Sequence, residues 1–316
     1  MRAVVLTSFG TAPELVDLAV PEPAEAHVRV RVHAASINGF DTAVVNGSLD
    51  GVLEHRFPVV LGRDFAGTVD ALGAGVVEYQ VGDRVFGVVT KPYLGDGSFA
   101  EYVTVSTSVG IAVLPEQIDF LEGAALGSAG TAAIAVMKAA DLHPGQTVLV
   151  AGATGGVGNQ AVQLAAKAGA RVLATARTAE GKALVTALGA TVALDYEDVA
   201  GAVRAAYPDG VDVVVHLAGD PTAVLTAVRD GGRFVSTRIG SPDELHTAHA
   251  TVVAISAEPD SGKLWSAARN EADGTTRVRI QDTFPLDQAP SALAAFAAGA
   301  AGAAGAAGKI VITVVS

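Results

Sequence analysis

The chain has 316 residues, more than one ordinary hydrophobic core accommodates, so two domains are expected. Half of the residues are hydrophobic and 17% are charged, a composition that excludes a chain disordered throughout. The net charge of −12 disfavours a nucleic-acid partner, and the absence of cysteine excludes disulfides, iron–sulfur clusters, thiolate zinc sites and cysteine nucleophiles.

The first 110 residues or so read as short strands separated by turns. The clearest run, Val28–His33, has strict period two, which is typical of a half-buried strand. Further strands are expected at 65–70, 83–88 and 99–105, with glycines supplying the bends between them. Several short strands at this spacing predict a β-barrel or a β-sandwich.

From about residue 120 the pattern changes to helices that alternate with apolar strands. Strands that are buried on both faces and separated by helices predict a parallel, doubly wound sheet, and hence an α/β fold. The expected helices are 121–140, 156–168, 181–188, 199–206 and 221–228, and the expected strands are 147–151, 171–174, 191–194, 211–215, 233–236 and 251–256.

The last segment no longer follows the alternating pattern of the second domain. A helix is expected near 288–298, and we expect the final strand, 309–315, to return to the first domain. The Ala-Ala-Gly repeat at 300–308 predicts a loop or frayed helix end without function. We therefore expect a first domain at 1–120, completed by 271–316, and a second domain at 121–270.

No targeting or membrane segment is expected. The N-terminus turns polar at Thr7 without the apolar run and small-residue cleavage site of a signal peptide. The uncharged stretches 123–137 and 144–166 are interrupted by Gly, Thr, Gln and Asn, and lack the Leu, Ile and Val density of a membrane span. The sequence therefore predicts a soluble, cytoplasmic protein.

The strongest local motif is a glycine turn, Gly152–Gly158, between an apolar strand and an amphipathic helix. Gly155 would let the backbone approach a pyrophosphate, and Gly158 would let the helix pack on the strand. We expect Gly155, Gly156, Val157 and Gly158 to bind a dinucleotide at the helix N-terminus. The alternative is a tight strand-to-helix turn without a ligand.

The end of the next strand indicates which nicotinamide cofactor binds. An Asp or Glu usually holds the ribose 2′-OH of NAD there, but this chain has Arg177 and no acid. An arginine suits a 2′-phosphate, and Lys182 lies about one helical turn beyond it. The sequence favours NADPH; the alternative is a pair of solvated cations at a helix start.

Together these motifs resemble the zinc-independent medium-chain dehydrogenases/reductases of the quinone oxidoreductase (zeta-crystallin-like) group. The resemblance covers nearly the whole chain and rests on Asn38–Asp41, Leu61–Val69, Val81–Val85, Gly97–Tyr102 and Gly152–Gly158. It implies a GroES-like barrel made by the first part and the C-terminal strand, with a Rossmann domain inserted. It also implies homo-oligomers, most often homodimers joined through the sheets of the nucleotide domain.

The resemblance also implies chemistry without a metal. In zinc-dependent relatives a Cys stands at the position of Asn38 and a His at the position of Arg63, and both are missing here. Without a Lewis acid, alcohol oxidation of the zinc kind is not expected. NADPH can still deliver a hydride to a small-molecule quinone or to the β-carbon of an enone.

By resemblance, Asn38 and Asp41 lie beside the acceptor, Thr131 near the nicotinamide and Tyr196 near the adenosine phosphate. We expect Asn38 to donate a side-chain N–H to the acceptor oxygen and Asp41 to orient the loop. A helix cap is the alternative explanation of Asn38 and Asp41.

Other polar residues have structural explanations. Asp64 and Asp83 are expected in turns or salt bridges rather than as catalytic acids. His246 and His249 have i, i+3 spacing but no third metal ligand, and His216 within an apolar strand is expected to be a hydrogen-bonded core residue.

Two alternative functions stay open: an enoyl-thioester reductase of polyketide or fatty-acyl assembly, and a nucleotide-binding regulatory protein without turnover. The physiological substrate is not readable, because the loops 45–57 and 238–249 shape its pocket.

Overall fold

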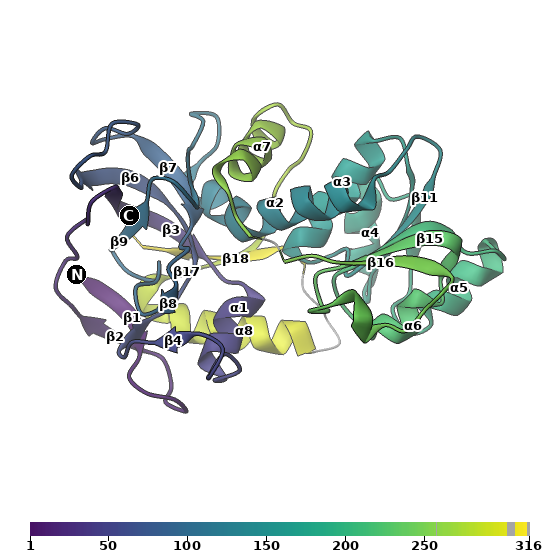
Figure 1. The fold of residues 1–316 in the computed structure, drawn as a ribbon, viewed down its shortest axis with the longest axis horizontal. Helices are drawn as coiled ribbons and strands as arrows, with labels where there is room; N and C mark the ends of the chain where they lie inside the picture. Colours follow the sequence, from purple (N-terminus) through teal and green to yellow (C-terminus); the bar gives the residue numbers. More distant parts are fainter. Residues whose placement is uncertain (257, 302–306, 315–316) are drawn as a thin grey trace.

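The molecule has two bodies, one built around a mainly antiparallel sheet and the other around a parallel sheet, and one long helix joins them (Figure 1). The computed structural model describes residues 1–256, 258–301 and 307–314. The first body holds α1 (Gly39–Val45) and the strands β1 (Arg2–Leu6), β2 (Glu14–Asp17), β3 (His27–Ser36), β4 (Glu54–His55), β5 (Val59–Val60), β6 (Asp64–Leu72), β7 (Arg84–Val88), β8 (Tyr93–Leu94), β9 (Tyr102–Ser106) and β10 (Ile111–Val113).

The main sheet of the first body is built from the predicted alternating runs. Its order is β10-β7-β6-β3-β18-β17, and β9 also pairs with β3. Val28, Val30 and Val32 of β3 are fully buried, whereas Arg31 between them is exposed. The predicted period-two strand is therefore confirmed, because alternate side chains of a strand point to opposite faces.

The second body is the predicted parallel sheet, in the order β13-β12-β11-β14-β15-β16. Strand order reverses beside β11, and ligands bind at such a point in doubly wound folds. Its elements are β11 (Thr147–Ala151), α3 (Gly156–Lys167), β12 (Arg171–Thr175), α4 (Ala179–Ala187), β13 (Val192–Leu194), α5 (Val199–Ala206), β14 (Val211–His216), α6 (Pro221–Leu225), β15 (Val228–Ser236), η1 (Pro242–Glu244) and β16 (Ala250–Ala254).

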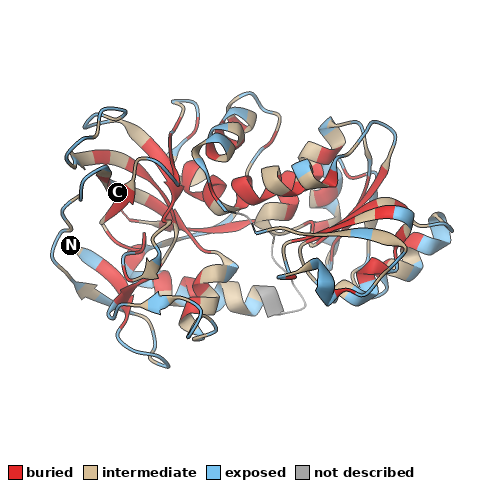
Figure 2. Ribbon diagram, in the orientation of Figure 1, coloured by how far each residue is buried: buried red, intermediate tan, exposed pale blue. Residues whose placement is uncertain are grey.

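The helix α2 (Phe120–Ala140) packs against both bodies, contacting β3, β6 and β7 of the first and α3 of the second. Among the described helices it alone is long and apolar enough to cross a membrane. Most of it is buried within the fold, as the red segments of Figure 2 show. It is therefore packed as a core helix that joins the two bodies.

The C-terminal elements return to the first body, as predicted. They are β17 (Ile280–Pro285), η2 (Leu286–Gln288), α8 (Ala289–Ala301) and β18 (Lys309–Thr313). β18 pairs antiparallel with β3 and parallel with β17. Residues 302–306 of the Ala-Ala-Gly repeat and residue 315 of the predicted strand lie outside the described residues.

Some predicted boundaries were wrong, and one helix was missed. The helix expected to reach Val228 ends at Leu225, because Val228 pairs with Val211 and opens β15. The strand expected from Phe99 begins at Tyr102. The helix α7 (Ser261–Ala272) was missed, although Asp260 caps it and Leu264 and Ala268 form its buried stripe.

Candidate functional site

Two hollows lie on either side of the loop that leads from β3 into α1. The larger, of about 710 Å³, is lined on the loop side by Ile37, Asn38 and Gly39. The smaller, of about 240 Å³, is lined by the next two residues, Phe40 and Asp41. One short loop therefore separates a cleft at the parallel sheet from a cavity in the antiparallel body.

The glycine turn forms the floor of the larger cleft. Gly155, Gly156, Val157 and Gly158 all line it, at the N-terminus of α3. A Cβ at position 158 would lie 2.2 Å from the Gly152 carbonyl oxygen, whereas a Cβ at position 155 would lie 3.7 Å from that oxygen. Position 158 therefore needs glycine for packing, and position 155 has space in front of the backbone.

The side chain of Asn159 holds this turn together from within α3. Its Nδ2 donates to the carbonyl oxygens of Ala153, Thr154 and Gly155 at 3.3, 2.8 and 3.0 Å. Asn159 is 1% exposed, so these carbonyls are satisfied away from water. Asn159 could not be identified from the sequence, because nothing about a polar residue in a helix indicates that its side chain donates back to the preceding turn.

Arg177 and Tyr196 form the far end of the cleft. Both line it, and the Arg177 guanidinium carbon lies 4.3 Å from the centroid of the Tyr196 ring. None of the described residues that line the cleft is Asp or Glu. A cation in a lining whose described residues include no carboxylate suits a ribose 2′-phosphate better than a 2′-OH.

Two predicted cofactor residues do not line the cleft. The Thr131 hydroxyl is fully buried and donates to the carbonyl oxygens of Gly127 and Ser128 within its own helix. The Lys182 ammonium lies 2.6 Å from a carboxylate oxygen of Asp195. The structure therefore brings together the glycine turn, Arg177 and Tyr196, and leaves Thr131 and Lys182 outside.

The cleft fits a nicotinamide dinucleotide. Its volume suits a large ligand, its floor is bare backbone at a helix N-terminus, and a cation stands at its far end. The glycine turn would hold the pyrophosphate, and Arg177 and Tyr196 would hold the adenosine end.

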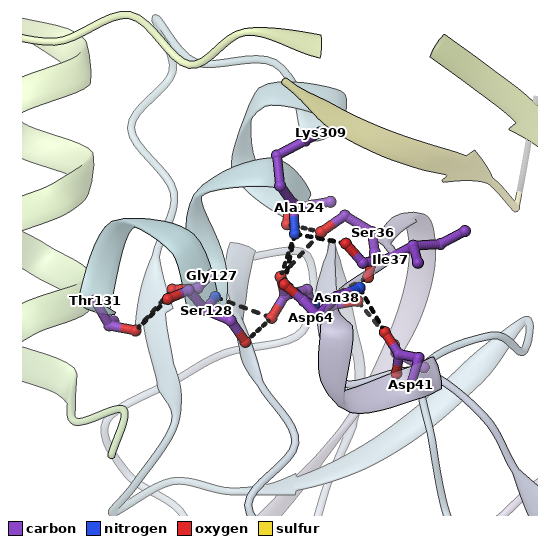
Figure 3. A network of polar contacts seen from close by, with 11 residues as sticks. Ser36, Ile37, Asn38, Asp41, Asp64, Ala124, Gly127, Ser128, Thr131 and Lys309 are labelled. Atoms are coloured by element: carbon purple, nitrogen blue, oxygen red, sulfur yellow. Dashed lines mark hydrogen bonds and ion pairs between the residues drawn. The ribbon is translucent and has the colours of Figure 1, made fainter. Parts of the chain in front are cut away.

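A network of polar contacts centred on Asp64 closes the near end of the cleft (Figure 3). Asp64 is fully buried in β6, and one of its oxygens accepts from the Ser128 N–H at 2.9 Å and the Ser128 hydroxyl at 2.5 Å. The other oxygen accepts from Ser36, Asn38 and Lys309 at 2.9, 2.9 and 3.4 Å. Asp64 is thus a salt-bridge residue, as expected, but it lies in a strand rather than in a turn.

The Asn38 amide has one possible orientation in this network. Its Oδ1 accepts from Lys309 Nζ at 2.6 Å, and its Nδ2 donates to Asp64 at 2.9 Å and to the Ser36 carbonyl at 3.3 Å. Because Lys309 only donates and a carboxylate only accepts, the reverse orientation is excluded. Both amide N–H groups are already used, so this arrangement does not offer the acceptor the N–H that we expected.

Asp41 stabilises the start of α1. Its carboxylate accepts from the Asn38 backbone N–H at 2.7 Å, as a helix-capping residue would. The side chain is 1% exposed, and this burial raises the pKa of Asp41 to about 7, against the lowering effect of the Asn38 N–H. The nearby Asp64 carboxylate raises the pKa further, whereas Lys309 and Arg63 lower it.

Lys309 was missed from the sequence. Its Nζ also donates to the Ile37 carbonyl at 2.8 Å, and only 4% of the residue is exposed. A Cβ at Gly156 would lie 2.6 Å from Lys309 Cδ, so the stem of the lysine packs against the glycine turn. The one signal available was a charged residue at the start of an apolar strand, which normally marks an exposed strand end.

The remaining candidates behave as structural residues. His216 is fully buried and contacts Ser236 at 2.9 Å and the Gly219 carbonyl at 3.2 Å, which confirms it as a hydrogen-bonded core residue. Asp83 accepts from the Gln80 N–H in a turn, as expected. His249 contacts Thr247, and the described residues contain no cluster of three potential metal ligands around it or elsewhere.

The smaller cavity is lined by Arg63, which stands at the position of the zinc-ligand histidine of zinc-dependent relatives. Nothing else in the sequence singles this residue out. Arg63 lines the cavity with its guanidinium carbon 4.3 Å from the Phe40 ring centroid. Lys91 lines it too, but its ammonium is held by Asp96 at 2.6 Å and Thr104 at 3.0 Å.

The chain matches known proteins over its whole length. Residues 24–116 match the alcohol dehydrogenase GroES-like domain, and residues 156–259 match the zinc-binding dehydrogenase domain. A quinone oxidoreductase of Sus scrofa is 30% identical over 314 residues, covering 92% of each chain. A chloroplast envelope quinone oxidoreductase homolog of Arabidopsis thaliana is 31% identical over 317 residues, covering 93% of this chain and 94% of that one.

The solved structures agree. The quinone oxidoreductase of Coxiella burnetii has a TM-score of 0.89 at 28% identity and covers 100% of this chain and 99% of its own. The fold, the sequence and the arrangement of the glycine turn all indicate the same family. The chain belongs to the quinone oxidoreductase (zeta-crystallin-like) group of the medium-chain dehydrogenases/reductases, with a GroES-like domain and a Rossmann domain.

Proposed function

We propose that the protein is an NADPH-dependent reductase of small quinones or α,β-unsaturated carbonyl compounds that works without zinc. The observation that carries the proposal is the cleft whose lining brings Arg177 and Tyr196 together with the glycine turn. The names of relatives support it: an NADPH-dependent alkenal/one oxidoreductase of Arabidopsis thaliana is 31% identical over 249 residues, covering 75% of this chain and 62% of that one.

The bound nicotinamide would supply the hydride, and the protein would supply position and charge. The glycine turn would hold the pyrophosphate, and the loop 37–41 would place the acceptor between the larger cleft and the smaller cavity. We propose that Asn38 and Asp41 act as positioning residues, because both spend their polar atoms on the loop, the network and the helix start.

The residues at the positions of the zinc ligands support a mechanism without a metal. Asn38 is held by Asp64 and Lys309, and Arg63 brings a positive charge of its own. A guanidinium cannot coordinate a cation, because it has no lone pair to offer.

The proposal is tested by following the absorbance of NADPH with a panel of quinones, enones and enoyl thioesters, with and without a zinc chelator. We expect oxidation with quinones or enones, unchanged by the chelator and slower with NADH. Oxidation with the thioesters alone would assign the protein to acyl assembly. Intact NADPH binding with silence across the panel would indicate a regulatory protein, and loss of activity with the chelator would contradict the metal-free reading.

We further propose a cytoplasmic homodimer joined through the nucleotide domains. Strand β16 forms one edge of the parallel sheet and pairs only with β15 among the described residues. An exposed strand edge offers its backbone groups to a second copy of the chain. Sedimentation velocity that shows a monomer at micromolar concentration would contradict this.

A further inference from the structure

The guanidinium of Arg63 has donors without a protein partner at the wall of the smaller cavity. Its Nε donates weakly to the Val89 carbonyl at 3.4 Å. Within residues 1–256, 258–301 and 307–314, neither terminal nitrogen has a hydrogen bond or an ion pair. Because arginine carries five N–H donors, most of its hydrogen-bonding capacity is directed at solvent or a ligand.

Other partly buried arginines of the chain are satisfied by the protein. Arg29 pairs with Asp70 at 2.6 Å, and Arg229 pairs with Asp212 at 2.8 Å. Arg84 donates to the carbonyl oxygens of Pro115 and Ile118. Arg63 differs from them, since Asp41, a carboxylate in the same cavity wall, accepts from the Asn38 backbone instead.

The cavity around Arg63 suits one flat, conjugated molecule. At about 240 Å³ it exceeds the roughly 150 Å³ cavity that holds a benzene ring in a protein core. Its walls are mostly apolar, with side chains that include Phe40, Val44, Leu53, Leu61, Val89 and Leu94. Charged side chains also line it: Asp41, Arg63, Lys91, Asp96 and Glu258. A mostly apolar wall with a cation whose donors are unused favours a ligand with an oxygen on an otherwise apolar ring.

We propose that Arg63 is a catalytic residue that binds the acceptor oxygen on which negative charge develops. The proposal rests on the proposed function and names the group that stabilises its transition state. Asn38 cannot take this role while its N–H groups bind Asp64 and Ser36, and Lys91 is held by Asp96 and Thr104. Arg63 is thus the cation in this cavity wall, within the described residues, whose terminal donors are unused.

The chemistry is that of a conjugate reduction. Hydride adds to the β-carbon of an enone, and the electron pair of the carbon–carbon π bond shifts to lie between the α-carbon and the carbonyl carbon. The carbonyl π bond breaks at the same time, and its electron pair moves onto the oxygen. Arg63 donates N–H groups to that oxygen, and a proton from solvent then adds to the α-carbon. In total the acceptor takes up one hydride, which is a hydrogen nucleus with two electrons, and one proton. The hydride is the chemistry that a bound NADPH would supply. A quinone gains its oxyanion in the same way.

The test compares Arg63→Gln and Arg63→Lys with the wild type. We expect Arg63→Gln to lower kcat roughly 10²-fold with little change in NADPH affinity, as when an oxyanion donor is removed. Arg63→Lys keeps the positive charge but loses the paired N–H donors of the guanidinium, so we expect its kcat to lie between those of Arg63→Gln and the wild type. Added guanidinium chloride should raise the rate of Arg63→Gln and not that of the wild type. Arg269→Gln is the control, because Arg269 also rests on an aromatic ring, Trp265, away from both hollows.

A binding measurement tests Arg63 without turnover. The probes are 2-hydroxy-1,4-naphthoquinone, an enolate at neutral pH, and its neutral 2-methoxy counterpart, both titrated by calorimetry. We expect Arg63→Gln to weaken the enolate about tenfold or more and to leave the neutral probe unchanged. Equal weakening of both probes, or wild-type kcat in Arg63→Gln, would overturn the proposal. If the wild type binds the enolate through Arg63 but reduces no acceptor, the proposed function fails and the oxygen-binding role stands.

Discussion

The two hollows beside the loop 37–41 are made in different ways. The larger cleft is floored by the backbone of one continuous turn, Gly152–Gly158, whose geometry follows from where glycine stands. The smaller cavity is walled by side chains from α1, β5, β8 and the segments that follow β5 and β7. A backbone site tolerates changes in its surroundings and fails when a glycine gains a Cβ. A side-chain site depends on contacts between distant segments. The Asp64 network illustrates this, because its hydrogen bonds join residues from several elements (Figure 3).

The largest expected effect breaks the backbone site. Gly158→Val should prevent folding or abolish binding of both nicotinamide cofactors, because a Cβ there meets the Gly152 carbonyl oxygen at 2.2 Å. Gly155→Ala is the matched control, since its Cβ has space and should leave the melting temperature unchanged while weakening nucleotide binding. Circular dichroism and calorimetry measure the two effects. Equal stability of both variants would show that the turn tolerates side chains.

The next effect concerns the side-chain network. Lys309→Met should lower the free energy of unfolding by about 3–5 kcal/mol, because it leaves Asp64 buried without its cation. Urea denaturation measures this loss. The double variant Lys309→Met with Asp64→Asn should recover part of it, since the buried charge is then removed as well. A double variant less stable than the sum of both single changes would contradict the pairing.

A smaller effect appears in the dependence of stability on pH. The pKa of Asp41 is about 7 in the fold and about 4 in an unfolded chain, so the folded state holds the extra proton between these values. The stability that this provides is complete below pH 4 and is lost as the pH rises to 7. Asp41→Asn should therefore flatten the fall in the free energy of unfolding over this window by roughly 4 kcal/mol.

Glu271 provides the control for that measurement. Burial raises the pKa of Glu271 to about 7 as well, but this residue lies on α7, away from both hollows. Glu271→Gln should flatten the same pH window and leave turnover unchanged, whereas Asp41→Asn should alter both. A stability profile for Asp41→Asn that coincides with that of the wild type would contradict the buried, protonated carboxyl.

The smallest effect tests whether Arg177 in the larger cleft distinguishes NADPH from NADH. Arg177→Ala should weaken NADPH binding by about 1.5–3 kcal/mol and NADH binding much less, because only NADPH carries a 2′-phosphate. Lys182→Ala should change little, since Lys182 pairs with Asp195 outside the cleft. Titration calorimetry with both cofactors decides the point. Equal losses for NADPH and NADH would assign Arg177 a structural role against Tyr196.

The sequence by itself determined the parts whose cause is local. The period of Val28–His33, the apolar strands from residue 147 onward and the glycine turn each follow from neighbouring residues, and the structure places them as expected. The same reasoning identified the C-terminal strand, because strand residues carry their own conformational preferences. The segment Asn38–Asp41 was singled out through the family resemblance instead, and it forms the start of α1. The proposed preference for NADPH likewise rests on one residue, Arg177, which lies just beyond the end of β12.

The tertiary structure alone decided which side chains meet. Lys309 is 271 positions away from Asn38, and nothing in either neighbourhood announces that they share a hydrogen bond. Val228 reads as helix from its neighbours, but pairing with Val211 makes it the start of a strand. Asp64, next to Arg63 in the chain, accepts hydrogen bonds from Ser128 and pairs with Lys309, both from distant elements. The proposed role of Arg63 therefore depends on contacts that its own neighbours in the sequence do not indicate. Backbone geometry is set within a few residues, whereas the partners of a buried charge are set by how the whole chain closes around it.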